Sequence, residues 1–85
     1  VANVVGENLR KLGETSQVIC VTHLSQVAAR GNHQFSVSKN LGKQAQTRVV
    51  KLDPDQRIEE IARMTGGENI TEQSLAHAEE MLKQA

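Results

Sequence analysis

A histidine at the end of a short apolar run, His23, is the residue of this chain best placed to do chemistry. The run lies within residues 17–22, and its four consecutive apolar residues are typical of a strand buried on both faces of a parallel sheet. Open α/β sheets bind their ligands at the carboxyl ends of such strands. His23 is therefore predicted either to face a phosphate or a water molecule, or to be a structural histidine with a fixed polar partner.

Two phosphate-binding patterns are absent from the sequence. Gly42 and Lys43 are followed by Gln44, and Val37 stands where a P-loop needs its first glycine. The glycine pair at residues 66–67 does not follow a predicted strand, so it is not a dinucleotide-binding fingerprint. The sequence therefore provides no phosphate cradle of its own.

The other nucleophilic and metal-binding side chains form no recognisable group. The three histidines are widely spaced and Cys20 falls within the apolar run, so the sequence predicts no metal site. Ser25 lies two residues from His23, a spacing that favours chance over a nucleophile paired with a base. His33 and His77 are expected to be surface residues.

The elements that would position His23 follow from the spacing of apolar residues. Apolar side chains recur at helical spacing over residues 1–12, and Gly13 would end that helix. A loop at residues 14–16 leads into the buried strand, and a short helix is predicted over residues 25–30. This order gives half of a parallel crossover with His23 at the end of its strand.

A β-hairpin is predicted after the short helix. Phe35 and Val37 alternate with polar residues, a turn is predicted at residues 40–43, and residues 47–52 are rich in β-formers. The basic residues of this hairpin are Lys39, Lys43, Arg48 and Lys51.

Two helices are predicted after the hairpin. Asp53 can cap a helix with Pro54 in its first turn and Gln56 placed for a capping box, and this helix is expected to end near residues 66–67. Thr71 is the predicted cap of the last helix, whose apolar stripe is Leu75, Ala78, Met81 and Leu82. The predicted fold class is α/β, with a partial mixed sheet and flanking helices in the order α-β-α-β-β-α-α.

The composition favours a part of a larger unit. In 85 residues Phe35 is the only aromatic residue, which leaves a thin aliphatic core for a domain of this size. The chain shows no signal peptide and no apolar run near the ~20 residues that span a membrane. The single cysteine, Cys20, is expected to be buried in the strand and fits a reducing cytoplasm.

Opposite charges gather in the two halves of the chain. Residues 1–52 carry seven Lys or Arg against two acids, and residues 53–85 carry three against eight, so the halves are about +5 and −5. The halves could attract each other or neighbouring domains, the basic half could bind a phosphate-rich ligand, or most of these charges could simply be solvated.

Three stretches of the sequence resemble the RecN family of bacterial recombination-repair proteins. Residues 17–28 match a Gln-Val-x-x-Val-Thr-His-Leu-x-Gln-Val-Ala stretch, and residues 57–67 match an Arg-x-x-Glu-(Ile/Leu)-Ala-Arg-(Met/Leu)-x-Gly-Gly segment. Residues 71–82 match a Thr-x-x-x-Leu-x-x-Ala-x-x-(Met/Leu)-Leu ending. Many ATPase heads of the ABC and SMC type share the strand and histidine, whereas the last two stretches narrow the resemblance to RecN. Ser25 departs from the family, where many relatives are expected to have proline.

The resemblance implies that residues 1–85 form the C-terminal part of an ATPase head. Residues 1–52 would contain a helix, the core strand and the hairpin, and residues 53–85 the two C-terminal helices. His23 would be a switch histidine that reaches the γ-phosphate of ATP and the attacking water, with Thr22 and Leu24 setting its backbone. The intact protein would hydrolyse ATP with Mg²⁺ and act in DNA double-strand break repair by recombination.

The resemblance also implies partners and a location. The partners would be the rest of the ATPase head, a second head in a homodimer, and DNA, in the cytoplasm at the nucleoid and away from membranes. The P-loop, the signature motif and the acidic strand of such heads lie upstream of the matched part. The isolated chain is therefore expected to be inactive and to hold no cofactor, while the intact protein would be an ATPase.

A non-catalytic interaction module is the alternative from another functional class. In that case the basic hairpin would contact nucleic acid or a partner protein. The lack of aromatic residues that stack on bases counts against single-strand binding. An unrelated small structural domain would require the long match to be a coincidence.

Overall fold

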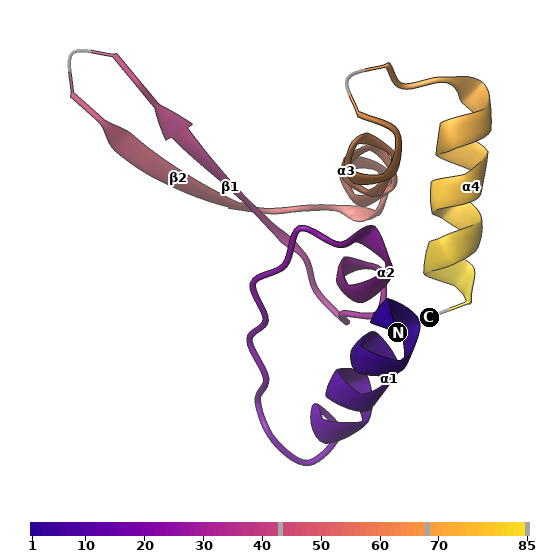
Figure 1. Ribbon diagram of the computed structural model, residues 1–85. Helices are drawn as coiled ribbons and strands as arrows, with labels where there is room; N and C mark the ends of the chain where they lie inside the picture. Colours follow the sequence, from indigo (N-terminus) through magenta and orange to yellow (C-terminus); the bar gives the residue numbers. More distant parts are fainter. Residues whose placement is uncertain (43, 68, 85) are drawn as a thin grey trace.

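The computed structural model describes residues 1–42, 44–67 and 69–84. Within these residues the elements follow in the order α1 (Ala2–Leu12), α2 (Ser25–Ala28), β1 (Phe35–Asn40), β2 (Gln46–Lys51), α3 (Pro54–Gly66) and α4 (Glu72–Lys83). The helices lie together and the hairpin of β1 and β2 projects away from them (Figure 1). The predicted α/β class with flanking helices is confirmed, and its two strands are antiparallel.

The first helix, α1, ends at the glycine that the sequence marks as its stop. The backbone N–H of Gly13 donates to the carbonyl oxygen of Leu9 at 3.0 Å. Arg10 and Lys11 lie in the last turn, where cations complement the negative end of the helix dipole. The local sequence is therefore sufficient to place the end of α1.

Reciprocal hydrogen bonds begin both α3 and α4. Asp53 Oδ1 accepts from the backbone N–H of Gln56 at 2.8 Å, and Gln56 Oε1 accepts from the backbone N–H of Asp53 at 3.0 Å. Thr71 and Ser74 form the same arrangement, with distances of 3.1 and 2.8 Å. The predicted caps at Asp53 and Thr71 are therefore confirmed, and each satisfies backbone donors that the helix leaves free.

The core lies where α3 packs against α4 and α2. Ile61 is 0% exposed and is the largest fully buried side chain of the described residues. Three alanines surround it, Ala29, Ala62 and Ala78, so the core is small and aliphatic, as the composition predicts. Partly buried apolar side chains pack against this cluster, among them Ile58, Met64, Leu75, Met81 and Leu82.

The hairpin carries apolar and basic side chains on one face. Its antiparallel register pairs Phe35 with Lys51, Val37 with Val49, and Lys39 with Thr47. Because directly opposite residues share a face, these six side chains form what we call the mixed face. The apolar residues of the mixed face are more than half exposed. Lys43, predicted as a basic residue of the turn, lies outside the described residues.

The strand predicted at residues 17–22 is not formed, so this prediction is wrong for the chain as it stands. The segment lies outside helices and strands, and Ile19 and Val21 are 85% and 97% exposed. Cys20 is also exposed, contrary to its predicted burial. A buried strand needs neighbours for its backbone groups, and the described strands β1 and β2 pair only with each other. Within the described residues, the apolar run therefore pairs with neither strand of the sheet.

Candidate functional site

His23 lies on the surface, in the exposed segment that leads into α2. Thr22 before it is half-buried, and Leu24 after it is 40% exposed. Leu24 is the N-terminal cap residue of α2 and has an extended backbone, with φ −96° and ψ 121°. The structure therefore places His23 at the entrance to a helix, and not at the end of a formed strand.

A side-chain hydrogen bond fixes the backbone on both sides of His23. The backbone N–H of Leu24 donates to Thr22 Oγ1 at 3.0 Å, which closes a tight turn around the histidine. The carbonyl oxygen of Leu24 in turn accepts from the backbone N–H groups of Val27 at 3.2 Å and Ala28 at 3.0 Å. The turn of His23 and the helix α2 are therefore one hydrogen-bonded unit.

A close approach at Gly6 places α2 against α1. Gly6 is buried, and a Cβ at this position would lie 3.2 Å from the carbonyl oxygen of Gln26 and 3.3 Å from Val27 Cα. It would also lie 3.0 Å from Arg30 Cγ. Because two of these neighbours are backbone atoms of α2, a glycine allows the helices to come this close. This contact holds α2 from the side of α1.

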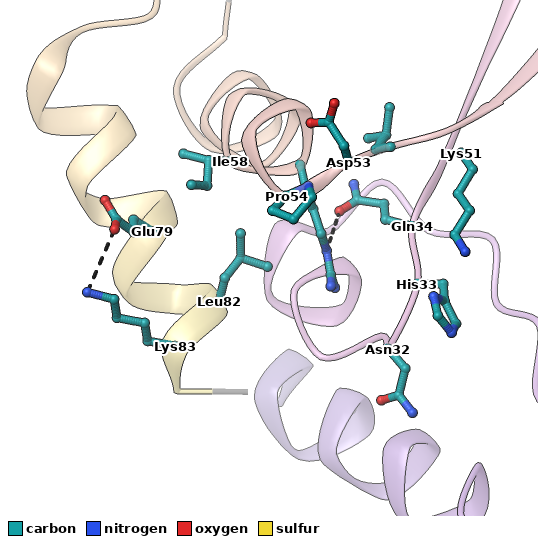
Figure 2. Close-up of a pocket in the computed structure, with 12 residues that line it drawn as sticks. Asn32, His33, Gln34, Lys51, Asp53, Pro54, Ile58, Glu79, Leu82 and Lys83 are labelled. Carbon is teal, nitrogen blue, oxygen red and sulfur yellow. Dashed lines mark hydrogen bonds and ion pairs between the residues drawn. The ribbon is translucent and has the colours of Figure 1, made fainter.

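The side chain of Arg57 holds α2 from the side of α3. Its Nη2 donates to the carbonyl oxygens of Ala28 at 3.1 Å and Ala29 at 3.3 Å, and also to that of Gly31. Its Nε donates to Gln34 Oε1 at 3.0 Å (Figure 2). One guanidinium group therefore ties α3 to the end of α2 and to the loop before the hairpin.

The charge of Arg57 is retained although its surroundings oppose it. Burial, and after it the positive charge of Arg10, lower the pKa of the Arg57 guanidinium from its ordinary value. Guanidinium groups nevertheless stay protonated in proteins, so the bonds to carbonyl oxygens are charge-assisted. Sequence reasoning gave Arg57 no role of its own, because its acceptors lie 23 to 29 residues earlier in the chain.

The other side chains considered from the sequence do not join His23. His33 and His77 are exposed, as predicted. Ser25 is 6% exposed, and its hydroxyl lies 3.5 Å from Gln26 Oε1. No three His, Cys, Asp or Glu side chains of the described residues lie close enough together to hold a metal ion.

A hollow between the start of α3 and the end of α4 lies apart from the candidate site (Figure 2). At its edge the Lys83 ammonium group lies 3.7 Å from a carboxylate oxygen of Glu79. His23 does not line it. The apolar side chains that line the hollow are Leu52, Pro54, Ile58 and Leu82.

The candidate site is an exposed imidazole on a backbone that is fixed by hydrogen bonds. A neutral imidazole has one N–H donor and one acceptor, and an imidazolium has two donors. Either form can contact a phosphate oxygen or a water molecule that another part of the protein brings to this surface. None of the described helices is both long and apolar enough to cross a lipid bilayer.

The chain is similar to bacterial DNA repair proteins over nearly its whole length. It is 57% identical to the DNA repair protein RecN of Vibrio cholerae and 49% identical to that of Haemophilus influenzae, each over 95% of the chain. It is 40% identical to RecN of Bacillus subtilis over 100% of the chain. The chain spans about 15% of the length of these relatives. No family model matches the chain.

Proposed function

We propose that this chain, which its sequence similarity identifies as a segment of the RecN type, is the C-terminal part of an ATPase head that acts in DNA double-strand break repair. In this proposal His23 is the switch histidine that contacts the γ-phosphate of ATP and the attacking water. The observation that carries the proposal is the exposed imidazole of His23 on a fixed turn. Because it is exposed, this imidazole is open to a partner that the rest of the head would bring to it.

The chemistry asked of His23 is positioning and charge stabilisation. Phosphoryl transfer needs little covalent help from the protein, so a donor aimed at the γ-phosphate oxygens is sufficient to contribute to catalysis. The bond between Thr22 and Leu24 keeps the histidine backbone in place while the nucleotide binds and leaves. Mg²⁺ would neutralise phosphate charge. The described residues hold no cluster of three or more His, Cys, Asp or Glu side chains that could bind it by themselves.

The exposed segment at residues 17–22 fits a partner within the same head. Ile19 and Val21 present branched apolar side chains to solvent, which proteins rarely leave uncovered in a continuous run. The chain spans about 15% of the length of its relatives. In a complete head of this kind, the rest of the protein would supply the strands that this segment lacks. We propose that residues 17–22 become a buried strand when the head is complete.

The wider setting of the proposal comes from the resemblance to RecN. Two heads would form a homodimer that encloses ATP, and the complete protein would act on DNA. Such a protein would be located in the cytoplasm, at the nucleoid.

Substitution of His23 in the full-length protein tests the proposed function. His23→Ala is expected to lower kcat for ATP hydrolysis by about 100-fold, the effect of removing one donor to a developing charge, with little change in ATP affinity. His77→Ala is the matched control, because His77 is an exposed histidine on α4. If His23→Ala hydrolyses ATP at the rate of the unaltered protein, the proposal is wrong.

The hairpin provides a second candidate function, as a contact for nucleic acid or a partner protein. It projects from the helices (Figure 1), and its mixed face carries Lys39 and Lys51 beside exposed apolar side chains. Lysines on a projecting ribbon can contact the phosphates of DNA, and each such contact makes binding depend on salt. If the hairpin binds DNA, a double Lys39→Ala and Lys51→Ala variant should reduce the salt slope of binding by about 2. An unchanged slope would exclude this role for the two lysines.

A further inference from the structure

The surroundings of Arg57 differ from those of an ordinary surface arginine. Its guanidinium faces backbone carbonyl oxygens and the side chain of Gln34, and it forms no ion pair with a carboxylate of the described residues. Arg63, which lies on the same helix, is instead exposed and paired with Glu60. Arg57 therefore donates hydrogen bonds to backbone carbonyl groups at the end of α2, and it does not neutralise a carboxylate of α3.

The carbonyl groups that Arg57 contacts belong to the end of a very short helix. The last carbonyl groups of a helix have no partner within it, and those of Ala28 and Ala29 receive the guanidinium N–H at 3.1 and 3.3 Å. A helix of four residues is too short to be stable through its own hydrogen bonds. Tertiary contacts must therefore hold α2, and they include the close approach at Gly6, the burial of Val27 and Ala29, and the bonds from Arg57.

A continuous set of hydrogen bonds leads from the end of α2 to His23. Ala28, whose carbonyl oxygen accepts from Arg57, donates its own N–H to the carbonyl oxygen of Leu24 at 3.0 Å. The N–H of Leu24 donates to Thr22 Oγ1, also at 3.0 Å. His23 stands between these two residues. These bonds provide a route by which a shift at the end of α2 would reach the backbone on both sides of the histidine.

We propose that Arg57 is a positioning residue for His23, acting through α2. This inference rests on the proposed function, because it assigns Arg57 to the same reaction. The guanidinium keeps α2 in the orientation that points His23 at the γ-phosphate, and Gln34 keeps the guanidinium in place. Without these contacts the segment around His23 would adopt several conformations, and the imidazole would reach the reacting group in only some of them.

Kinetics of Arg57 variants of the full-length protein provide the test. Arg57→Ala is expected to lower kcat by ~10- to 100-fold, the size of effect that follows from a misplacement of about 1 Å, with KM for ATP nearly unchanged. Arg57→Lys keeps the charge but cannot bind the carbonyl groups and Gln34 at once, so its kcat should be intermediate. Arg63→Ala, the matched control on α3, should keep the kcat of the unaltered protein.

A double substitution separates positioning from a general effect on stability. If Arg57 acts through His23, adding Arg57→Ala to His23→Ala should lower kcat no further. Hydrogen exchange of the amides at residues 24–28 should be faster in Arg57→Lys, at equal retention of the overall fold. This second readout also decides the matter if Arg57→Ala fails to fold.

The outcomes distinguish the inference from the proposed function. The proposed function fails if His23→Ala keeps its full rate. The inference alone is overturned if His23→Ala is slow while Arg57→Lys keeps full kcat, or if the two alanine substitutions multiply their effects on kcat. An increase in KM without a loss of kcat in the Arg57 variants would also overturn it.

Discussion

Two isoleucines with opposite surroundings allow the contrast between the core and the exposed segment to be measured. Ile61 of α3 is 0% exposed and lies in the core that α3 forms with α4 and α2. Ile19 is 85% exposed, in the segment that the sequence predicts to be a buried strand. The same substitution to alanine at both positions removes the same atoms. Any difference in its effect on stability therefore reports the surroundings of the residue.

The expected magnitude follows from the burial of each side chain. Ile→Ala removes three carbon groups, worth about 2.4 kcal/mol of transfer free energy when fully buried, and the cavity adds to this within a range of about 2–5 kcal/mol. Alanine has the better helix propensity, which offsets only about 0.3 kcal/mol of this loss of stability at Ile61. We expect Ile61→Ala to lower the free energy of unfolding of the chain by about 3 kcal/mol. At concentrations at which the chain is monomeric, Ile19→Ala should change it by less than about 0.5 kcal/mol.

Native-state hydrogen exchange measures these effects in the 85-residue chain and in the full-length protein. If residues 17–22 become a buried strand in the complete head, Ile19→Ala should there cost about 2.4 kcal/mol and speed exchange of its neighbouring amides by roughly 50-fold. An equally small effect of Ile19→Ala in both proteins would refute burial of the segment in the complete head. A small effect of Ile61→Ala in the chain would refute the described core.

Two further predictions concern the chain itself. Asp53→Ala removes the carboxylate that accepts from Gln56 at 2.8 Å, so it should lower the free energy of unfolding by about 1 kcal/mol in chemical denaturation, while Asp55→Ala, a matched change in the first turn of α3, should cost less. The exposed Val1 before α1, Val5 within α1 and the uncovered residues 17–22 should cause the isolated chain to form dimers or higher species. Sedimentation at several concentrations would contradict this by showing a monomer throughout.

The sequence predicts those parts of the fold that are determined by neighbouring residues. The cap at Asp53 requires only Pro54 and Gln56 beside it, and the end of α1 requires only Gly13 after a basic turn. The hairpin likewise follows from the alternation around Phe35 and a nearby turn. In each case the residues that decide the structure lie within a few positions of one another.

The predictions that are wrong or missing concern parts of the structure that depend on residues far apart in the sequence. The apolar run at residues 17–22 indicates a buried environment, but the run does not say which part of the protein covers it, and β1 and β2 do not. The contacts of Arg57 cannot be predicted from the sequence, because an arginine near the start of a helix is usually solvated. Its acceptors, such as the carbonyl oxygen of Ala28, come together with it only in the folded chain.

The distance between His23 and bound nucleotide shows most clearly whether His23 acts as a switch histidine. The measurement is a crystal structure of the full-length protein with a non-hydrolysable ATP analogue and Mg²⁺. We expect an imidazole nitrogen of His23 within about 2.7–3.2 Å of a γ-phosphate oxygen, with Thr22 Oγ1 still accepting from the N–H of Leu24. A His23 side chain turned away from the nucleotide, or bonded to a protein partner instead, would contradict it.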